Sequence, residues 1–443
     1  MAKNVADATV ESVRQRAVAD RKAIEDTYRR RTRKSAELVK RGARSLPGGV
    51  TRGFGSYQPY QAVMERGAGA FLWDIDGNRY VDLIYNGLSL IHGHAYPPVI
   101  RAIEDWLPRG WAWLSTSLPQ IEFAELLCDR IKTFDKVLFT NSGTESGMLA
   151  VKLARHFTGR PLILKTTAGY HGTYSDLEAG LHGKGEIPGH TVLADFNDLG
   201  SFERALGQHG SQIAAVVLEP VMYTGVVTPP VGSFLRDVQD AAHRAGALFV
   251  LDDCLMFRLA YGGAAEKFGL EPDLTFLGKF IGGGTPVGAV GGREEIVELA
   301  DPNHPKGTYH GGSFNGNVLG SVAGRVTVED LTAAKISEMD KHAGRLKAAL
   351  EMRAAKLGLP LAVPSNGSVM GVYFSQERLS PGPEVPNADL SRSFHLACLN
   401  NGVHMGPGGM IAMSTAIDDN TMAEVISAME DALDRVAAPA ASG

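Results

Sequence analysis

The chain has 443 residues and a formal net charge of −5, which comes from 44 Lys and Arg against 49 Asp and Glu. This near balance gives no global basic field, so it argues against nucleic-acid binding and against attachment to an anionic membrane. No apolar run approaches the length of a membrane span.

Cysteine usage and the amino terminus indicate a compartment. Cys128, Cys254 and Cys398 are too few and too scattered for a disulfide framework or a zinc site, which favours a reducing environment. The amino terminus has no apolar signal core, and acidic residues interleave with its basic ones, which argues against a transit peptide. We therefore expect a cytoplasmic protein without a metal site.

The first elements in chain order are helical and then extended. Residues 5–43 predict one or two helices with a basic run at 29–34, which we interpret as a solvated face rather than a polyanion-binding arm because acids interleave. Asp76-Gly77 predicts a hairpin between strands at 70–74 and 79–83. This segment forms an antiparallel lobe ahead of the main sheet.

From about residue 120 apolar strands alternate with helices, which predicts an α/β fold with a mostly parallel sheet covered on both faces. The strands are expected at 136–140, 161–165, 213–218, 248–251 and 274–277, and helices at 119–132, 145–157 and 232–245. Further helices are expected from 329 to 357 and from 417 to 437. We predict that residues 91–328 form a large domain, and that residues 1–90 and 329–443 together build a smaller one.

Lys279 follows the apolar run 274–277 and precedes glycines 282–284, so it lies where a strand gives way to a loop. Open α/β sheets place their chemistry at the carboxyl ends of strands. A lysine amine there can form a Schiff base with an aldehyde. The alternative is a lysine whose ammonium group simply reaches solvent beside a glycine-rich turn.

Polar residues follow the other strands in the same way. Ser142, Gly143 and Thr144 stand at a strand-to-helix turn, where they could cradle a phosphate or only cap the helix. Asp252 could ligate a metal, cap the next helix or face a ring nitrogen, and Glu219 could orient the same ring.

One cofactor would use all of these residues at once, namely pyridoxal 5'-phosphate. Tyr170 or His171, in the loop 169–172, could stack on its ring, although a buried aromatic is the alternative. A dinucleotide site is excluded because no Gly-x-Gly-x-x-Gly pattern follows an early strand, and no P-loop is present.

The motifs taken together resemble the class III aminotransferases, which have fold type I among pyridoxal-phosphate enzymes. They are Asn-Ser-Gly-Thr-Glu at 141–145, Gly-Tyr-His-Gly at 169–172, Glu219-Pro220, Asp252-Asp253, Lys279 and Gly-Gly-Ser-Phe-Asn at 311–315. The resemblance spans residues 45 to 435. Pro-Gly-Gly-Val-Thr-Arg at 47–52 and Phe-Arg-Leu-Ala-Tyr-Gly-Gly at 257–263 are most similar to the branch of glutamate-1-semialdehyde aminomutase and the β-amino-acid aminotransferases.

This resemblance implies roles for single residues and a homodimer with shared active sites. Lys279 would form the Schiff base and shuttle the substrate proton, Asp252 would pair with the pyridine nitrogen, and Tyr170 would cover one ring face. Ser313, where the family usually has threonine, would reach the phosphate of the neighbouring subunit. Arg52 would take the substrate carboxylate, although a surface arginine would look the same in the sequence.

The chain also departs from the family pattern. Cys254 replaces a valine that packs against the ring, and its similar volume predicts tuned rather than lost activity. Residues 404–410 lack the glutamate-bearing gating loop of the aminomutase. Gly408 stands where the β-amino-acid enzymes have an arginine. The resemblance to these relatives therefore does not identify the substrate of this chain. We expect Tyr57, Trp113 and Tyr223 to contribute to side-chain specificity.

The sequence thus predicts an aminotransferase that moves an amino group between an amino acid or amine donor and a keto acceptor. A carboxylate-bearing substrate is expected, with the amino group at the α or the β position. The alternatives are an aminomutase, a decarboxylase or a racemase on the same scaffold, because the fold does not decide which bond breaks. A catalytically silent binding protein is a further alternative.

Overall fold

The structure is a computed structural model that describes residues 22–181, 189–375, 379–380, 382 and 384–437. Part of the helical segment predicted at 5–43 lies outside these residues. The described part is a helix over residues 22–31 followed by α2 (Arg33–Gly42). Within the described residues, no helix is long and apolar enough to cross a membrane.

The central sheet has seven strands in the order β4-β10-β9-β8-β7-β5-β6. Neighbouring strands from β9 to β6 are parallel, and β10 runs antiparallel to both β4 and β9. The strands are β4 (Lys136–Thr140), β5 (Leu162–Thr166), β6 (Thr191–Ala194), β7 (Ile213–Leu218), β8 (Leu248–Asp252), β9 (Leu274–Leu277) and β10 (Gly288–Gly292). The predicted mostly parallel sheet is confirmed, whereas β6 and β10 were missing from the prediction.

Helices cover both faces of this sheet, because alternate residues of each strand point to opposite sides. On β7, Val217 packs in the apolar cluster that contains α6, whereas Val216 packs in the cluster that contains α8 and α9. The helices of this part are α5 (Leu118–Arg130), α6 (Gly143–Thr158), α7 (Ser175–Glu178), α8 (Leu199–His209), α9 (Phe234–Arg244), α10 (Gly263–Phe268) and α11 (Glu294–Val297).

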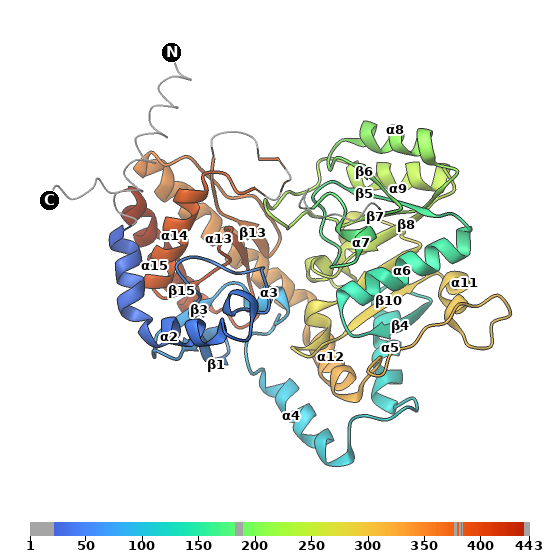
Figure 1. The fold of residues 1–443 in the computed structure, drawn as a ribbon, viewed down its shortest axis with the longest axis horizontal. Helices are drawn as coiled ribbons and strands as arrows, with labels where there is room; N and C mark the ends of the chain where they lie inside the picture. Colours follow the sequence, from blue (N-terminus) through green and yellow to red (C-terminus); the bar gives the residue numbers. More distant parts are fainter. Residues whose placement is uncertain (1–21, 182–188, 376–378, 381, 383, 438–443) are drawn as a thin grey trace.

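The first and the last described segments of the chain lie side by side, as the blue and red ribbons of Figure 1 show. A four-stranded sheet has the order β1-β2-β3-β15, in which β3 from the amino-terminal part pairs in parallel with β15 from the carboxyl-terminal part. The strands are β1 (Met64–Ala68), β2 (Phe71–Asp74), β3 (Arg79–Asp82) and β15 (Val403–His404). The predicted hairpin is present, since β2 and β3 are antiparallel around Gly77.

The remaining elements complete this second body and its link to the central sheet. Its helices are α3 (Tyr85–Leu88), α13 (Ala333–Leu357), α14 (Ala388–Asn400) and α15 (Asp419–Ala437), and its short strands are β11 (Leu361–Ala362), β12 (Ser365–Asn366), β13 (Val369–Gly371), β14 (Tyr373–Phe374) and β16 (Met410–Ala412). The helices α4 (Pro97–Trp106) and α12 (Val318–Asp330) pack against each other, and α12 also packs against α5. The domain boundaries at residues 90 and 328 stay a prediction.

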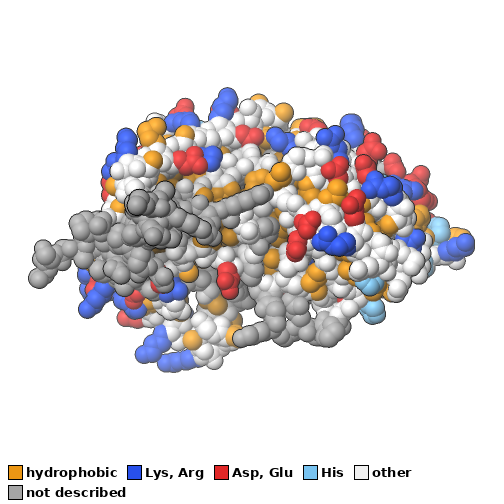
Figure 2. All heavy atoms as spheres, turned by 90° about the horizontal axis from the view of Figure 1, so that it is seen from above, with side chains coloured by type: hydrophobic (Ala, Val, Ile, Leu, Met, Phe, Trp, Pro, Cys, Tyr) orange, Lys and Arg blue, Asp and Glu red, His pale blue; other side chains and the backbone are white. Residues whose placement is uncertain are grey.

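The surface carries charges of both signs. On the face in Figure 2, Lys and Arg side chains lie among Asp and Glu side chains rather than in a patch of their own. This mixture agrees with the small net charge of −5.

Candidate active site

Three of the predicted site residues come to one edge of the central sheet. Glu219 follows β7, Asp252 is the last residue of β8, and Lys279 opens the short turn η4 (Lys279–Gly282) after β9. Because β7, β8 and β9 are neighbouring parallel strands, their carboxyl ends meet. All three side chains line one cavity, together with Tyr170, Tyr223, Thr224, Leu255 and Met256.

Asp252 is buried and is held from two sides. Its Oδ2 atom lies 2.8 Å from Nδ1 of His171, and its Oδ1 atom accepts a hydrogen bond of 3.1 Å from the backbone N–H of Cys254. Burial lowers the pKa of His171, although Asp252 acts in the opposite direction. A neutral imidazole therefore donates from Nδ1 to the carboxylate and fixes its orientation.

Glu219 is buried in the same cavity as Asp252. Burial raises its pKa to about 8, and the negative charge of Asp252 adds to the shift. At neutral pH the carboxyl group therefore holds a proton and can donate a hydrogen bond into the cavity.

Lys279 lies half-buried in a strained backbone position. Its φ angle is 53°, in the left-handed region that side chains with a Cβ rarely adopt. Strain of this kind persists only where the surrounding structure enforces it, and it is concentrated at functional sites. Here the strained turn brings the lysine side chain to the cavity that Asp252 and Glu219 also line.

The turn before α6 provides hydrogen-bond donors for an anion. Ser142 is the N-cap of α6, and its Oγ atom accepts a hydrogen bond of 3.2 Å from the backbone N–H of Glu145. The amides of Gly143 and Thr144 belong to the first turn, where no intrahelical carbonyl can accept from them. A helix amino terminus of this length attracts phosphate through these amides and its dipole.

Close packing joins this turn to the strand ends. A Cβ atom on Gly143 would lie 2.8 Å from Sγ of Cys254, and one on Gly278 would lie 3.0 Å from Cα of Gly143. Glycine at both positions lets the start of α6 approach Gly278, which precedes Lys279, and Cys254, which follows Asp252 by two residues. The residues therefore fit pyridoxal phosphate, since an amine, a buried carboxylate and a helix amino terminus that could receive a phosphate lie on adjoining elements.

Comparison with known proteins decides the family. The sequence profile described as aminotransferase class III matches residues 55–433. The chain belongs to the class III aminotransferases. Their cofactor is pyridoxal phosphate, so this aminotransferase is a pyridoxal-phosphate enzyme of fold type I, as the sequence predicted.

Relatives of this aminotransferase carry two kinds of name. It is 35% identical over 418 residues to glutamate-1-semialdehyde 2,1-aminomutase 2 of Geobacillus kaustophilus (strain HTA426), covering 90% of this chain and 97% of that protein. An omega-transaminase from Sphaerobacter thermophilus is 32% identical with a TM-score of 0.85, and the match covers 91% of this chain and 97% of that protein. A β-phenylalanine aminotransferase from Variovorax paradoxus is 30% identical with a TM-score of 0.85, and the match covers 93% of this chain and 96% of that protein.

The remaining candidates for cofactor binding are Cys254, Tyr170 and Ser313, of which Cys254 is buried and the other two are exposed. Burial raises the pKa of the Cys254 thiol well above its usual range, which makes it unreactive. Tyr170 lines the Lys279 cavity, and its backbone N–H donates to Glu219. Ser313 is exposed and does not line this cavity in its own chain.

The three substrate-binding candidates do not line the Lys279 cavity. Trp113 is 45% exposed. Tyr57 packs its ring against His395 and bonds its hydroxyl to that of Tyr28. Arg52 donates a hydrogen bond of 2.9 Å to Oδ1 of Asn86 and lines a second cavity, together with Tyr57.

The Lys279 cavity also contains Tyr223 and three residues that the sequence analysis did not single out. Tyr223 was expected near the substrate, and its hydroxyl donates to the carbonyl of Ile411. Thr224, Leu255 and Met256 were missed. The available signal was their position, because each lies a few residues beyond Glu219 or Asp252 on the same loop. No group of three metal-binding side chains occurs among the residues that the structure describes.

Proposed function

We propose that this class III aminotransferase moves an amino group between a carboxylate-bearing amino donor and a keto acceptor. The observation that carries the proposal is the meeting of Lys279, Asp252 and Glu219 in one cavity, next to the amino terminus of α6. Pyridoxal phosphate supplies an electron sink for the carbon that bears the amino group.

Each residue has a defined part in this proposal. The amine of Lys279 would attach the cofactor and would carry the proton to and from the substrate carbon. Asp252, which His171 holds in place, would keep a proton on the pyridine nitrogen. Glu219, neutral at pH 7, donates a hydrogen bond to the ring side of the cavity. Ser142, Gly143 and Thr144 would bind the phosphate.

Substitution of Lys279 tests the proposal. Lys279→Ala should abolish turnover while the protein stays folded and binds the cofactor without a covalent bond. Lys356→Ala, which removes an exposed lysine on α13, is the matched control and should behave as wild type. Retained turnover in Lys279→Ala would exclude the proposed role.

An aminomutase is the second candidate, because relatives with 35% and 36% identity carry that name. The segment between β15 and β16 argues against it, since residues 405–409 form a tight turn without an acidic residue. Supplying the amino compound with and without a keto acceptor separates the two, because only the transaminase requires the acceptor for steady turnover. Conversion without an acceptor would favour the mutase.

We further propose a homodimer in which Ser313 reaches the phosphate of the partner subunit. Large apolar side chains are exposed near this loop and near the start of α5, including Tyr309 at 84%, Phe314 at 63% and Leu118 at 61%. Exposed apolar groups of this size are typical of an interface. Light scattering after size exclusion should give twice the mass of 47.3 kDa, and a monomer would exclude shared sites. The cytoplasm is the proposed compartment, because Cys128, Cys254 and Cys398 are all free thiols.

A further inference from the structure

Two strained turns of the backbone pack against each other next to the Lys279 cavity. One is α3, whose residues Tyr85, Asn86, Gly87 and Leu88 have φ angles of 43°, 54°, 67° and 68°. The other is η4, where Lys279 has a φ angle of 53°. The left-handed conformation costs free energy for every residue that has a Cβ atom, so it persists only where the surrounding structure enforces it. Some contact must therefore hold α3 in place.

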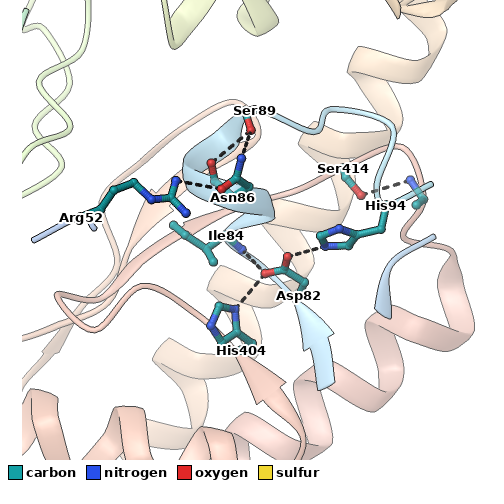
Figure 3. A network of polar contacts seen from close by, with 9 residues as sticks. Arg52, Asp82, Ile84, Asn86, Ser89, His94, His404 and Ser414 are labelled. Atoms are coloured by element: carbon teal, nitrogen blue, oxygen red, sulfur yellow. Dashed lines mark hydrogen bonds and ion pairs between the residues drawn. The ribbon is translucent and has the colours of Figure 1, made fainter. Parts of the chain in front are cut away.

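Asp82, the last residue of β3, holds the entry to α3 (Figure 3). Its side chain is fully buried, and its Oδ1 atom accepts a hydrogen bond of 2.9 Å from the backbone N–H of Ile84, the residue before the turn. Two histidines fix the same carboxylate, since Oδ2 lies 2.7 Å from Nε2 of His94 and Oδ1 lies 3.0 Å from Nδ1 of His404. Asp82 therefore ties the start of α3 to β15 and to the segment before α4.

The charge of Asp82 strengthens this tie. Burial favours the neutral acid, but the hydrogen bonds from His404 and His94 hold the pKa of Asp82 far below its usual range. A charged acceptor binds an N–H more strongly than a neutral one does. The bond to Ile84 is therefore a strong one in a place that water does not reach.

Beyond α3 the chain reaches the residues that follow Lys279. The N–H of Leu88 donates to the carbonyl of Ile84, which makes the turn one hydrogen-bonded unit. α3 contacts η4, and Leu90, two residues beyond α3, packs against Gly284. A Cβ atom on Gly284 would lie 2.9 Å from Cδ2 of Leu90, so no space separates the two segments. A displacement at the entry to α3 is therefore passed on to the turn that carries Lys279.

We propose that Asp82 is a positioning residue for the reaction at Lys279, because it holds the left-handed turn α3 in place against η4. The inference rests on the proposed aminotransferase function and adds a residue that does not line the Lys279 cavity. The direction in which η4 presents the lysine decides how well its amine reaches the cofactor and the substrate carbon. A misplacement of about 1 Å can lower a rate roughly 100-fold.

Asp74 offers a matched control in the same small sheet. It is the last residue of β2 and is as buried as Asp82. Its carboxylate accepts hydrogen bonds from the backbone N–H of Asn78 at 2.8 Å and from the hydroxyl of Tyr80 at 2.7 Å. Among the described residues, its side-chain hydrogen bonds reach neither α3 nor η4. Comparing the two acids therefore separates a contribution to stability from a contribution to the Lys279 turn.

Hydrogen–deuterium exchange of the holoenzyme without substrate tests the first step. In Asp82→Leu, the amides of residues 84–89 and 279–285 should exchange roughly 10-fold faster than in wild type, as expected from loss of a hydrogen bond to a charged group. Asp74→Leu should speed exchange at residues 76–78 and leave residues 279–285 unchanged. Asp82→Asn keeps an oxygen acceptor for Ile84 and should stay close to wild type. Unchanged exchange at residues 279–285 in a folded Asp82→Leu would overturn the proposal.

The consequence for the site is measured on the bound cofactor. Asp82→Leu should shift the absorbance of the holoenzyme and lower kcat by roughly 10-fold or more, whereas Asp74→Leu should keep the wild-type spectrum and kcat. If Asp82→Leu does not fold, Leu90→Ala removes the contact with Gly284 and should give the same spectral shift. A wild-type spectrum and kcat in whichever of these two variants folds would refute the role of Asp82. Absence of wild-type turnover with every donor would refute the proposed function instead.

Discussion

Oδ2 of Asp252 lies 2.8 Å from Nδ1 of His171, and both side chains are buried beneath the carboxyl edge of the central sheet. Nε2 of His171 has no partner among the described residues. The neutral imidazole therefore donates its one N–H, at Nδ1, to Asp252. In the proposed site, His171 would therefore act through the carboxylate rather than on the substrate, as a positioning residue.

Replacing His171 by Phe should keep the volume of the ring but remove this hydrogen bond. A hydrogen bond to a charged group contributes about 1.5–3 kcal/mol, so we expect kcat to fall roughly 10- to 100-fold. The absorbance of the bound cofactor should also shift, because its ring nitrogen would lose the fixed carboxylate. His190→Phe is the exposed control. An unchanged spectrum and kcat would show that His171 only fills space.

Glu219 makes stability depend on pH. Its pKa is about 8 in the folded state and 4.5 as the ordinary value, so below pH 4.5 both states hold the proton. Between these values the unfolded chain releases the proton and the folded one retains it, so stability falls as pH rises. Glu219→Gln has no titrating carboxyl group and so does not lose stability in this way. The unfolding free energy of the variant minus that of wild type should therefore increase from pH 5 to pH 8. Urea unfolding at several pH values measures this difference. The same dependence of unfolding free energy on pH in both proteins would contradict a raised pKa at Glu219.

Much of the fold was predictable because buried strands are short apolar runs. The bounds of β4, β7 and β9 agree with the prediction at every residue. β10 was missed because its sequence, Gly-Ala-Val-Gly-Gly, has the composition of a loop. Its glycines are needed for close packing, since a Cβ on Gly291 would lie 2.2 Å from the ring of Phe134. Such crowding depends on tertiary neighbours and leaves no local pattern.

The site shows the same division. Lys279, Asp252 and Glu219 were predicted to lie together because each stands at the carboxyl end of a strand, and all three line one cavity. The Asp82, His94 and His404 cluster was not predicted, since it joins residues more than 300 positions apart through the pairing of β3 with β15. No spacing rule covers a contact of that kind.

The packing of Gly143 against Cys254 gives a double-mutant test. Gly143→Ala would place its Cβ 2.8 Å from Sγ of Cys254, so the start of α6 must shift and cofactor affinity should fall. The strain should cost about 1–3 kcal/mol of unfolding free energy. Cys254→Ala alone removes the sulfur, and in the double variant it should restore most of the loss. Additive effects of the two substitutions would show that this contact does not limit the approach.

Two helix caps with the same geometry separate stability from cofactor binding. Ser142 accepts from the N–H of Glu145 at 3.2 Å, and Thr332, the N-cap of α13, accepts from the N–H of Lys335 at 3.3 Å. Replacing either residue by Ala should cost about 1 kcal/mol of unfolding free energy. Only Ser142→Ala should also weaken pyridoxal phosphate, by roughly 10-fold, because only its hydroxyl belongs to the proposed phosphate cup. Denaturant titration and cofactor titration measure the two effects, and equal cofactor affinity in both variants would remove Ser142 from the cup.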